Sequence, residues 1–508
     1  MAHVVLFLRL WLLPPSRLPL LIAVVSVFLI VVLALLSSFA TVLNRRMLAR
    51  LLLVVALLSV VAEAVVLVRL RGPERRPYAV VLPFSPGKES PQAWALSRTL
   101  CRNLRALSGN YYVGSFESVL EAVQADSVAD RTYVARFCAR SGLDAAVSGE
   151  LLQQGEALVW NGRLWRQGMW SDTTLPASAS ELARLAKDAQ AWLSRKLGVE
   201  PSRAGGREVY WDVQAAHADI LIRAAKFEEA RRVLGSAHAP LHWLLVGQSY
   251  LQEAKELRNL GRAWREPLYH AITTAEELVQ RDSTLADAHL LLAECHILEE
   301  EWDRAEIRLR KALALDPTAS HALVLLTRLH RSRYRDLGFE DEEQLYRRAV
   351  WYDPCSVSAR LGLVAYLQQL GRRAEALQAV DDVLRMNPSS IPGLLAKGRM
   401  LITWEQNEAG FACLEKAASL APDDPEVLFA LGVARYMTED YEGARPLFER
   451  AVAVGDHLDS YLYLGLIARR LGQPEKALPY LQERVRRKRD AQDRLAEIAR
   501  ENIFQLTH

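Results

Sequence analysis

Residues 422–451 read PDDPEVLFALGVARYMTEDYEGARPLFERA, and this pattern of helix, turn and helix returns across Trp302–Asp456. Prolines that end successive units stand 37, 34 and 34 residues apart, at Pro317, Pro354, Pro388 and Pro422. Small or apolar residues recur in one phase, in the sets Ala305, Leu309, Ala312; Ala376, Val380, Val383; and Ala444, Phe448, Ala451. Small side chains let two antiparallel helices approach closely, and proline cannot extend a helix. The pattern therefore predicts an array of helical repeats.

The step of 34 residues, the alanines of the second helix and the early pairs Leu431-Gly432 and Leu464-Gly465 resemble the tetratricopeptide family. The resemblance implies stacked helix pairs with a concave face that binds proteins. We expect these repeats over 209–487, followed by a capping helix over 488–508 whose outer face is polar.

Composition excludes several classes of protein. A chain of 508 residues is too long for one core, and a net charge of +3 supplies no global field for nucleic acid. Its five cysteines are odd in number and scattered, and no CxxC pair occurs. The sequence therefore favours neither a disulfide framework nor a zinc site.

Two apolar runs near the N-terminus predict membrane helices. Residues 18–43 carry no charge, and Leu51–Val68 is interrupted only by Glu63. A bilayer needs about 20 apolar residues, so we expect two transmembrane helices within 18–70, after an interfacial segment 1–17. An acid at the depth of Glu63 is a candidate for a transport role, although a protonated or snorkelling carboxyl is the plainer interpretation.

A linker over 71–77 leads to the segment 78–200, whose hydrophobic pattern differs from that of the repeats. Short apolar runs such as Ala79–Phe84 predict strands, a helix is expected over Pro91–Leu107, and Leu158–Trp165 alternates like a strand of an antiparallel meander. These elements predict a small α/β domain with a mixed sheet. A second linker, 201–208, separates it from the repeats.

The run Ala79-Val-Val-Leu-Pro-Phe84 and the later Arg140-Ser-Gly-Leu-Asp-Ala-Ala-Val-Ser-Gly149 resemble a TolB/FlgO-type domain. That family often precedes tetratricopeptide repeats in bacterial membrane proteins, usually outside the cytoplasm. The resemblance implies a binding or assembly module and brings no catalytic residue. The predicted fold class is thus a transmembrane helical hairpin, a small α/β domain with a mixed sheet, and an all-α superhelix.

The predicted location is a bacterial inner membrane crossed twice. Arginines at the two ends of the hairpin outnumber those of its loop, which favours a cytoplasmic body. The dense charge of the short loop and the habit of the resembling family favour an extracytoplasmic body, which we expect.

Motifs of catalysis are missing from the sequence. Pro86-Gly-Lys-Glu-Ser90 lacks the first glycine of a phosphate loop, and His289 and His296 are seven residues apart, which suits packing or a solvated face better than a metal. We expect no enzyme, no metal and no cofactor. The basic run Arg484–Arg489 permits an anionic surface or nucleic acid, but a solvated basic helix end is the favoured interpretation, and no nucleic-acid partner is expected.

The remaining candidate site is the concave face of the repeats. Inward positions of a first helix lie at its second, fifth, ninth and twelfth places, and the prolines set their phase. These positions give the candidate partner-binding residues Arg328, Arg331, Gln368, Arg399, Tyr436 and Arg469. Arginine among apolar neighbours suits a protein or peptide partner that carries carboxylates along an extended backbone.

The favoured function is a membrane-anchored scaffold that binds a protein partner in the groove, with the lipid bilayer as its second partner. One alternative is a sensor whose α/β domain binds a small ligand and signals through the repeats. Another is an accessory subunit of a membrane transport complex.

Overall fold

The computed structural model describes residues 77–85, 90–107, 111–123, 127–154, 157–198, 212–235, 239–490 and 492–507, without the side chains of Ala179 and Arg331. All of these residues belong to a single compact unit, Pro77–His508. The predicted boundary at 201–208 lies outside them, so the division of the chain into separate domains stays a prediction.

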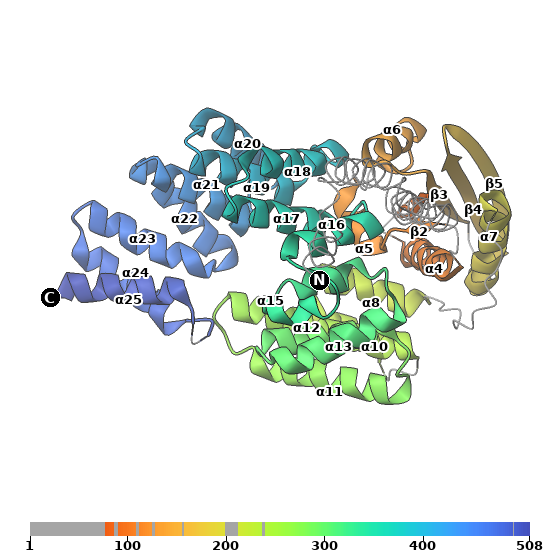
Figure 1. Ribbon diagram of the computed structural model, residues 1–508, viewed down its shortest axis with the longest axis horizontal. Coiled ribbons are helices and arrows are strands. Elements are labelled where there is room, and N and C mark those ends of the chain that lie inside the picture. Colours follow the sequence, from red (N-terminus) through yellow and green to blue (C-terminus); the bar gives the residue numbers. More distant parts are fainter. Residues whose placement is uncertain are drawn as a thin grey trace, which may run out of the picture. The chain divides into compact units, whose positions relative to one another are not determined.

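A small mixed sheet opens the described chain (Figure 1). Its strands are β1 (Tyr78–Val81), β2 (Tyr112–Val113), β3 (Ala145–Gln154), β4 (Ala157–Arg166) and β5 (Met169–Ser178), in the order β2-β1-β3-β4-β5. Strand β1 pairs in parallel with both β2 and β3, whereas β3, β4 and β5 form an antiparallel meander. The helices of this part are α4 (Pro91–Leu107), α5 (Phe116–Ala122), α6 (Arg131–Ser141) and α7 (Leu182–Leu197).

Trp160 organises the core of the meander. Its ring is fully buried, lies 5.3 Å from the ring of Phe84 and meets Trp192 of α7 edge-on at 6.1 Å. The space for it comes from Gly162, where an added Cβ would stand 2.4 Å from the indole. Here a glycine in a strand marks the close approach of a neighbouring ring rather than a turn.

The helical array runs from residue 213 to the C-terminus. Its helix pairs are α8 (Val213–Arg223) with α9 (Phe227–Leu234), α10 (Pro240–Asn259) with α11 (Arg265–Arg281), α12 (Ala286–Leu298) with α13 (Trp302–Leu315), α14 (Ser320–Leu326) with α16 (Glu342–Tyr352), α17 (Val357–Gln369) with α18 (Arg373–Met386), α19 (Ile391–Thr403) with α20 (Asn407–Leu420), α21 (Pro425–Met437) with α22 (Tyr441–Gly455), and α23 (Leu458–Arg470) with α24 (Pro474–Arg486). The short α15 (Arg331–Arg335) follows α14, and α25 (Arg494–Thr507) ends the array.

The repeat pattern has the physical basis that its spacing predicts. Ala444, Phe448 and Ala451 of α22 are fully buried, and so are Ala305, Leu309 and Ala312 of α13. An added Cβ on Gly432 would stand 2.8 Å from the ring of Phe448, so only glycine lets α21 and α22 meet at this distance. Consecutive helices therefore pack as the tetratricopeptide pattern requires.

The α/β part and the first repeats share one hydrophobic core. A single cluster of buried residues joins Val81 and Leu100 of the α/β part to Leu245 of α10 and Leu292 of α12. A second cluster joins Val80 and Val119 to Val357 and Val383 of α17 and α18. In addition, α4 packs on α8, α5 on α17 and α6 on α18. The α/β part is thus seated on the array along a continuous apolar surface.

Within the described ranges, no helix combines sufficient length with sufficient apolarity to cross a membrane. The helix α10 has 20 residues, but charged side chains interrupt it from Glu253 to Arg258. This finding overturns the predicted transmembrane hairpin in the fold class and the predicted two-pass location in a bacterial inner membrane. The physical reason is that each repeat helix buries one face against its neighbours and keeps charges on the other. Residues 18–70, with Glu63, lie outside the described part of the chain.

Replacing Gly432 with alanine tests the close approach of α21 and α22. The new Cβ overlaps the fully buried ring of Phe448, and overpacking of this kind costs about 1–3 kcal/mol. We expect a lower denaturant midpoint for Gly432→Ala, measured by circular dichroism. Ala453→Ser, which adds one atom at an exposed position of α22, should leave the midpoint nearly unchanged. Equal midpoints for both variants would contradict the tight packing.

Candidate functional site

One side of α4 carries an arginine ladder that fixes the α/β part to the array. Arg98, Arg102 and Arg105 are spaced i, i+4 and i+7, which places them on one face of the helix. Their carboxylate partners come from three places in the array: Asp219 of α8 at 2.6 Å, Asp287 of α12 at 2.9 Å and Asp316 after α13 at 2.9 Å. One helix therefore makes ion pairs with the first repeat, with the third repeat and with the turn that follows it.

The Asp-Pro turns between repeats serve two purposes. In Asp353, Oδ1 accepts a hydrogen bond from the amide of Cys355 within the turn, at 3.2 Å, and Oδ2 accepts one from the amide of Ser115 of the α/β part, at 3.0 Å. Asp316 divides its oxygens in the same way, between the amide of Thr318 and the guanidinium of Arg105. Burial raises the pKa of Asp353. These turns thus end one repeat and dock the α/β part.

The α/β part consequently covers the first-helix face of the early repeats. Leu361 of α17, an inward position, is partly buried against the cluster that contains Val80 and Val119 of the α/β part. We call the first-helix face of α19, α21 and α23 the open groove, because no buried cluster of the described residues joins these helices to the α/β part.

Two of the sequence-predicted residues come together in the open groove. Arg399 of α19 has a side chain that is 48% exposed, and Tyr436 of α21 is half-buried with its ring 5.2 Å from that of Tyr463 on α23. Burial raises the pKa of Tyr463, while the nearby charge of Arg399 acts in the opposite direction. Arg399 and the two tyrosines therefore belong to one neighbourhood.

The other predicted residues lie apart from that neighbourhood. Arg469 of α23 points to α25, where its guanidinium donates to Asn502 and to Gln505 Oε1 at 2.8 Å. Arg328 follows α14 and is exposed, Arg331 is the first residue of α15, and Gln368 is half-buried near the end of α17. The proposal that these four residues contact a partner stays a prediction.

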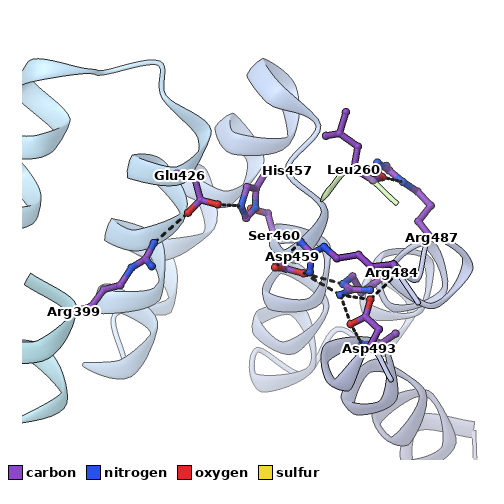
Figure 2. A network of polar contacts seen from close by, with 11 residues as sticks. Leu260, Arg399, Glu426, His457, Asp459, Ser460, Arg484, Arg487 and Asp493 are labelled. Atoms are coloured by element: carbon purple, nitrogen blue, oxygen red, sulfur yellow. Dashed lines mark hydrogen bonds and ion pairs between the residues drawn. The ribbon is translucent and has the colours of Figure 1, made fainter. Parts of the chain in front are cut away.

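A polar relay crosses the open groove and includes two residues that the sequence analysis did not select (Figure 2). Arg399 donates to Glu426 Oε2 at 3.2 Å, and Glu426 Oε1 lies 3.4 Å from His457 Nε2. The hydrogen bond with His457 and the charge of Arg399 lower the pKa of Glu426 to about 2, so the carboxylate is ionised. The ring of His457 also lies 4.4 Å from that of Phe429. Glu426 occupies the second place of its helix, so the inward spacing alone could have found it.

Part of the basic run Arg484–Arg489 is internal. Arg484 is fully buried between Asp459, at 3.0 Å, and Asp493, at 2.7 Å, and Arg489 pairs with the second oxygen of Asp459 at 3.0 Å. Arg487 is also buried and pairs with Asp456. The favoured interpretation as a solvated helix end is wrong for these arginines, because carboxylates distant in sequence enclose them.

His296, Glu299 and Glu301 bring their ligand atoms within 4.8 Å of one another, the one such group among the described residues. His296 Nδ1 lies 2.8 Å from Glu301, whose carboxylate also pairs with Arg304 at 3.0 Å. These groups satisfy one another, and both His289 and His296 are buried, as the packing interpretation predicts.

The buried pair of Arg98 and Asp219 should be critical for stability. Both side chains are 6% exposed, and Asp219 also accepts a hydrogen bond from Trp94 Nε1 at 2.8 Å. Removing one partner of a buried pair costs about 3–5 kcal/mol, because it leaves an uncompensated charge. We expect Asp219→Ala to lower the unfolding free energy by this amount in denaturant titrations.

The control is Asp172→Ala, which removes an exposed pair with Arg131 and should cost less than about 1 kcal/mol. Similar losses for the two variants would show that the Arg98–Asp219 pair is not a special constraint.

His321 on α14 gives the array a pH-dependent contact. Its Nε2 lies 2.8 Å from Glu294, which also pairs with Lys255, and Glu117 of α5 contributes further negative charge. Burial opposes the charged imidazole, but the charge and hydrogen bond of Glu294 outweigh it and raise the pKa of His321. A raised folded pKa adds stability below the unfolded value of about 6.5, and this stability is lost as the pH rises through the folded value.

We therefore expect His321→Gln to lower the melting temperature more at about pH 6 than at about pH 9. The same substitution in a Glu294→Gln background should lose this pH dependence. A difference between wild type and His321→Gln that is constant with pH would contradict the ion pair.

Comparison with known proteins supports the repeats. The tetratricopeptide repeat family matches residues 405–456 and 438–494. The chain is 23% identical over 270 residues to the BBSome complex member BBS4 of Bos taurus, a match that covers 46% of this chain and 50% of that protein. It is 25% identical over 149 residues to tetratricopeptide repeat protein 7A of Homo sapiens, covering 29% of this chain and 17% of that protein. The chain thus spans half or less of the length of these relatives.

Among solved structures, a tetratricopeptide repeat protein from Parabacteroides merdae is 15% identical, with a TM-score of 0.39, and covers 52% of this chain and 99% of its own. The resemblance of residues 78–200 to a TolB/FlgO-type domain stays a prediction. The family match and the helix packing together show that this chain carries tetratricopeptide repeats.

Proposed function

We propose that the chain is a non-enzymatic scaffold that binds a protein partner in the open groove of α19, α21 and α23. Tetratricopeptide arrays act generally as protein-interaction surfaces. One observation favours this groove as the binding surface. The α/β part covers the inward face of the early repeats, whereas Arg399 remains half exposed beside the aromatic rings of the later ones.

The chemistry of the open groove fits an extended segment with carboxylates. Phe429, Tyr436 and Tyr463 offer rigid rings that bury much surface at a small cost in side-chain entropy. Aromatic residues and arginine are the side chains that most often dominate binding energy at protein interfaces. Arg399 meets Glu426 through one guanidinium nitrogen at 3.2 Å, so its fork geometry leaves room for a second carboxylate.

Exposure of the Arg399–Glu426 pair favours exchange with a partner. The two side chains are 48% and 63% exposed, and an ion pair of this kind contributes at most about 1 kcal/mol. A partner carboxylate can therefore recruit Arg399 at little cost to the fold. Desolvation on binding would strengthen the new pair relative to the exposed one.

The test uses a labelled extended peptide in which glutamate alternates with apolar residues, and its counterpart with glutamine. We expect fluorescence anisotropy to show tighter binding of the glutamate peptide. Arg399→Ala should weaken that binding about ten-fold, equivalent to about 1.4 kcal/mol, without lowering the melting temperature.

The matched control is Arg450→Ala on α22, because Arg450 and its partner Asp423 are exposed to a similar degree, 51% and 67%. This variant should bind like the wild type. Equal binding by Arg399→Ala and Arg450→Ala would mean that the open groove does not dock the peptide.

A further inference from the structure

The turn that joins α10 to α11 contacts the last repeats of the array. Arg487, at the end of α24, donates from Nε to the carbonyl oxygen of Leu260 at 3.1 Å, with a further hydrogen bond from Nη2 (Figure 2). The same guanidinium holds both oxygens of Asp456, at 2.8 and 2.9 Å. Residues more than 220 positions apart thus meet through one side chain, since Leu260 and Arg487 are separated by 227 positions.

Two more ion pairs strengthen this contact. Arg258 lies 2.6 Å from Asp490, and Arg262 lies 2.7 Å from Asp456. Between them, Gly261 adopts a φ of +62°, and an added Cβ would stand 2.1 Å from the carbonyl oxygen of Arg487. The two backbones therefore touch at a position that only glycine fits.

This contact differs in kind from the seating of the α/β part. Among the described residues, no buried apolar cluster joins the turn at 258–262 to α22, α23 or α24. The contact consists of ion pairs and hydrogen bonds, several of them partly exposed, as for Arg262 with 55% of its side chain accessible. Exposed ion pairs weaken as salt shortens the screening length from about 10 Å at 0.1 M to about 3 Å at 1 M.

In a solenoid each repeat contacts only its neighbours, so the array can bend by small changes at every interface. A contact between distant repeats removes part of that freedom. We propose that Gly261, Asp456 and Arg487 form a releasable polar clasp, whose closed state fixes the geometry of the open groove for its partner.

The clasp is connected to the open groove through one residue. Asp456 precedes His457, which contacts Glu426 and the ring of Phe429 in the groove. Asp456 itself has a φ of +51°, so its backbone is held in a left-handed conformation between α22 and α23. A change in the clasp is thus transmitted to the turn that positions His457. This effect on binding rests on the proposed function, whereas the clasp itself rests on its own contacts.

The distance across the clasp can be measured in the full chain by double electron–electron resonance. Spin labels are attached at Ala263→Cys and Lys488→Cys, both exposed, after Cys413→Ser removes the partly exposed natural thiol. We expect a dominant short distance at low salt and a growing population of longer distances as salt rises.

Two variants should open the clasp by different means. Asp456→Asn removes the charge that holds Arg487 and Arg262, and asparagine tolerates the left-handed backbone. Gly261→Ala inserts a Cβ against the backbone of Arg487. The control Glu442→Gln makes the same change of charge at an exposed pair on α22. We expect longer distances for the first two variants and the wild-type distance for the control.

The proposed clasp would be overturned if the short distance persisted in Asp456→Asn, in Gly261→Ala and at high salt. The salt titration of the otherwise unaltered chain keeps this test valid even where a variant fails to fold.

Binding of the glutamate peptide tests the coupling separately. The distance measurement gives the closed fraction of the wild type and of Asp456→Asn. The apparent Kd of the variant should exceed that of the wild type by the wild-type closed fraction divided by the closed fraction of the variant. If the clasp opens in Asp456→Asn but the Kd does not change, the coupling between clasp and groove is overturned, while the clasp itself is still supported. Loss of the difference between Arg399→Ala and Arg450→Ala would instead overturn the proposed function, while the distances stayed as expected.

Discussion

The buried guanidinium of Arg98 is the constraint on which the arrangement of this molecule depends. A charged group with 6% of its side chain exposed is tolerated only where carboxylates and hydrogen bonds surround it, and Asp219 and Glu117 supply them from two different parts of the chain. Asp219 belongs to the first repeat and Glu117 to α5, so this single group requires the α/β part and the array to fold against each other. The apolar core that surrounds it then extends the contact over the following repeats.

This dependence changes what the array can offer to a partner. A free solenoid presents its inward face along its whole length. Here the α/β part packs on that face of the early repeats, whereas the later repeats combine half-exposed aromatic rings with the Arg399–Glu426 pair. The same repeat pattern therefore has a structural role in one part of the chain and a proposed recognition role in the other.

The sequence predicted the elements well because their signals are local. Prolines such as Pro388 mark repeat ends, and the phase of Ala444, Phe448 and Ala451 locates a buried helix face. Tertiary ion pairs have no such signal, since Arg105 and Asp316 are separated by 211 positions. For the same reason a run of basic residues looked solvated although Arg484 is fully buried. Within the candidate site, spacing alone selected Arg399 and Tyr436, but the contacts of Arg399 with Glu426 and of Tyr436 with Tyr463 required the fold.

The aspartates in the turns between repeats take part in the contact between the array and the α/β part, so a change at a turn can alter this contact. Asp316 and Asp353 use one carboxylate oxygen for the turn and the other for the α/β part. At the next turn Asn387 accepts the same local hydrogen bond, from Ser389 at 3.0 Å, but offers an amide donor where a second acceptor would stand. The two side chains differ by one atom and serve the repeat equally. A single substitution at such a turn can therefore add or remove one polar contact to the α/β part, without any change to the scaffold that carries it.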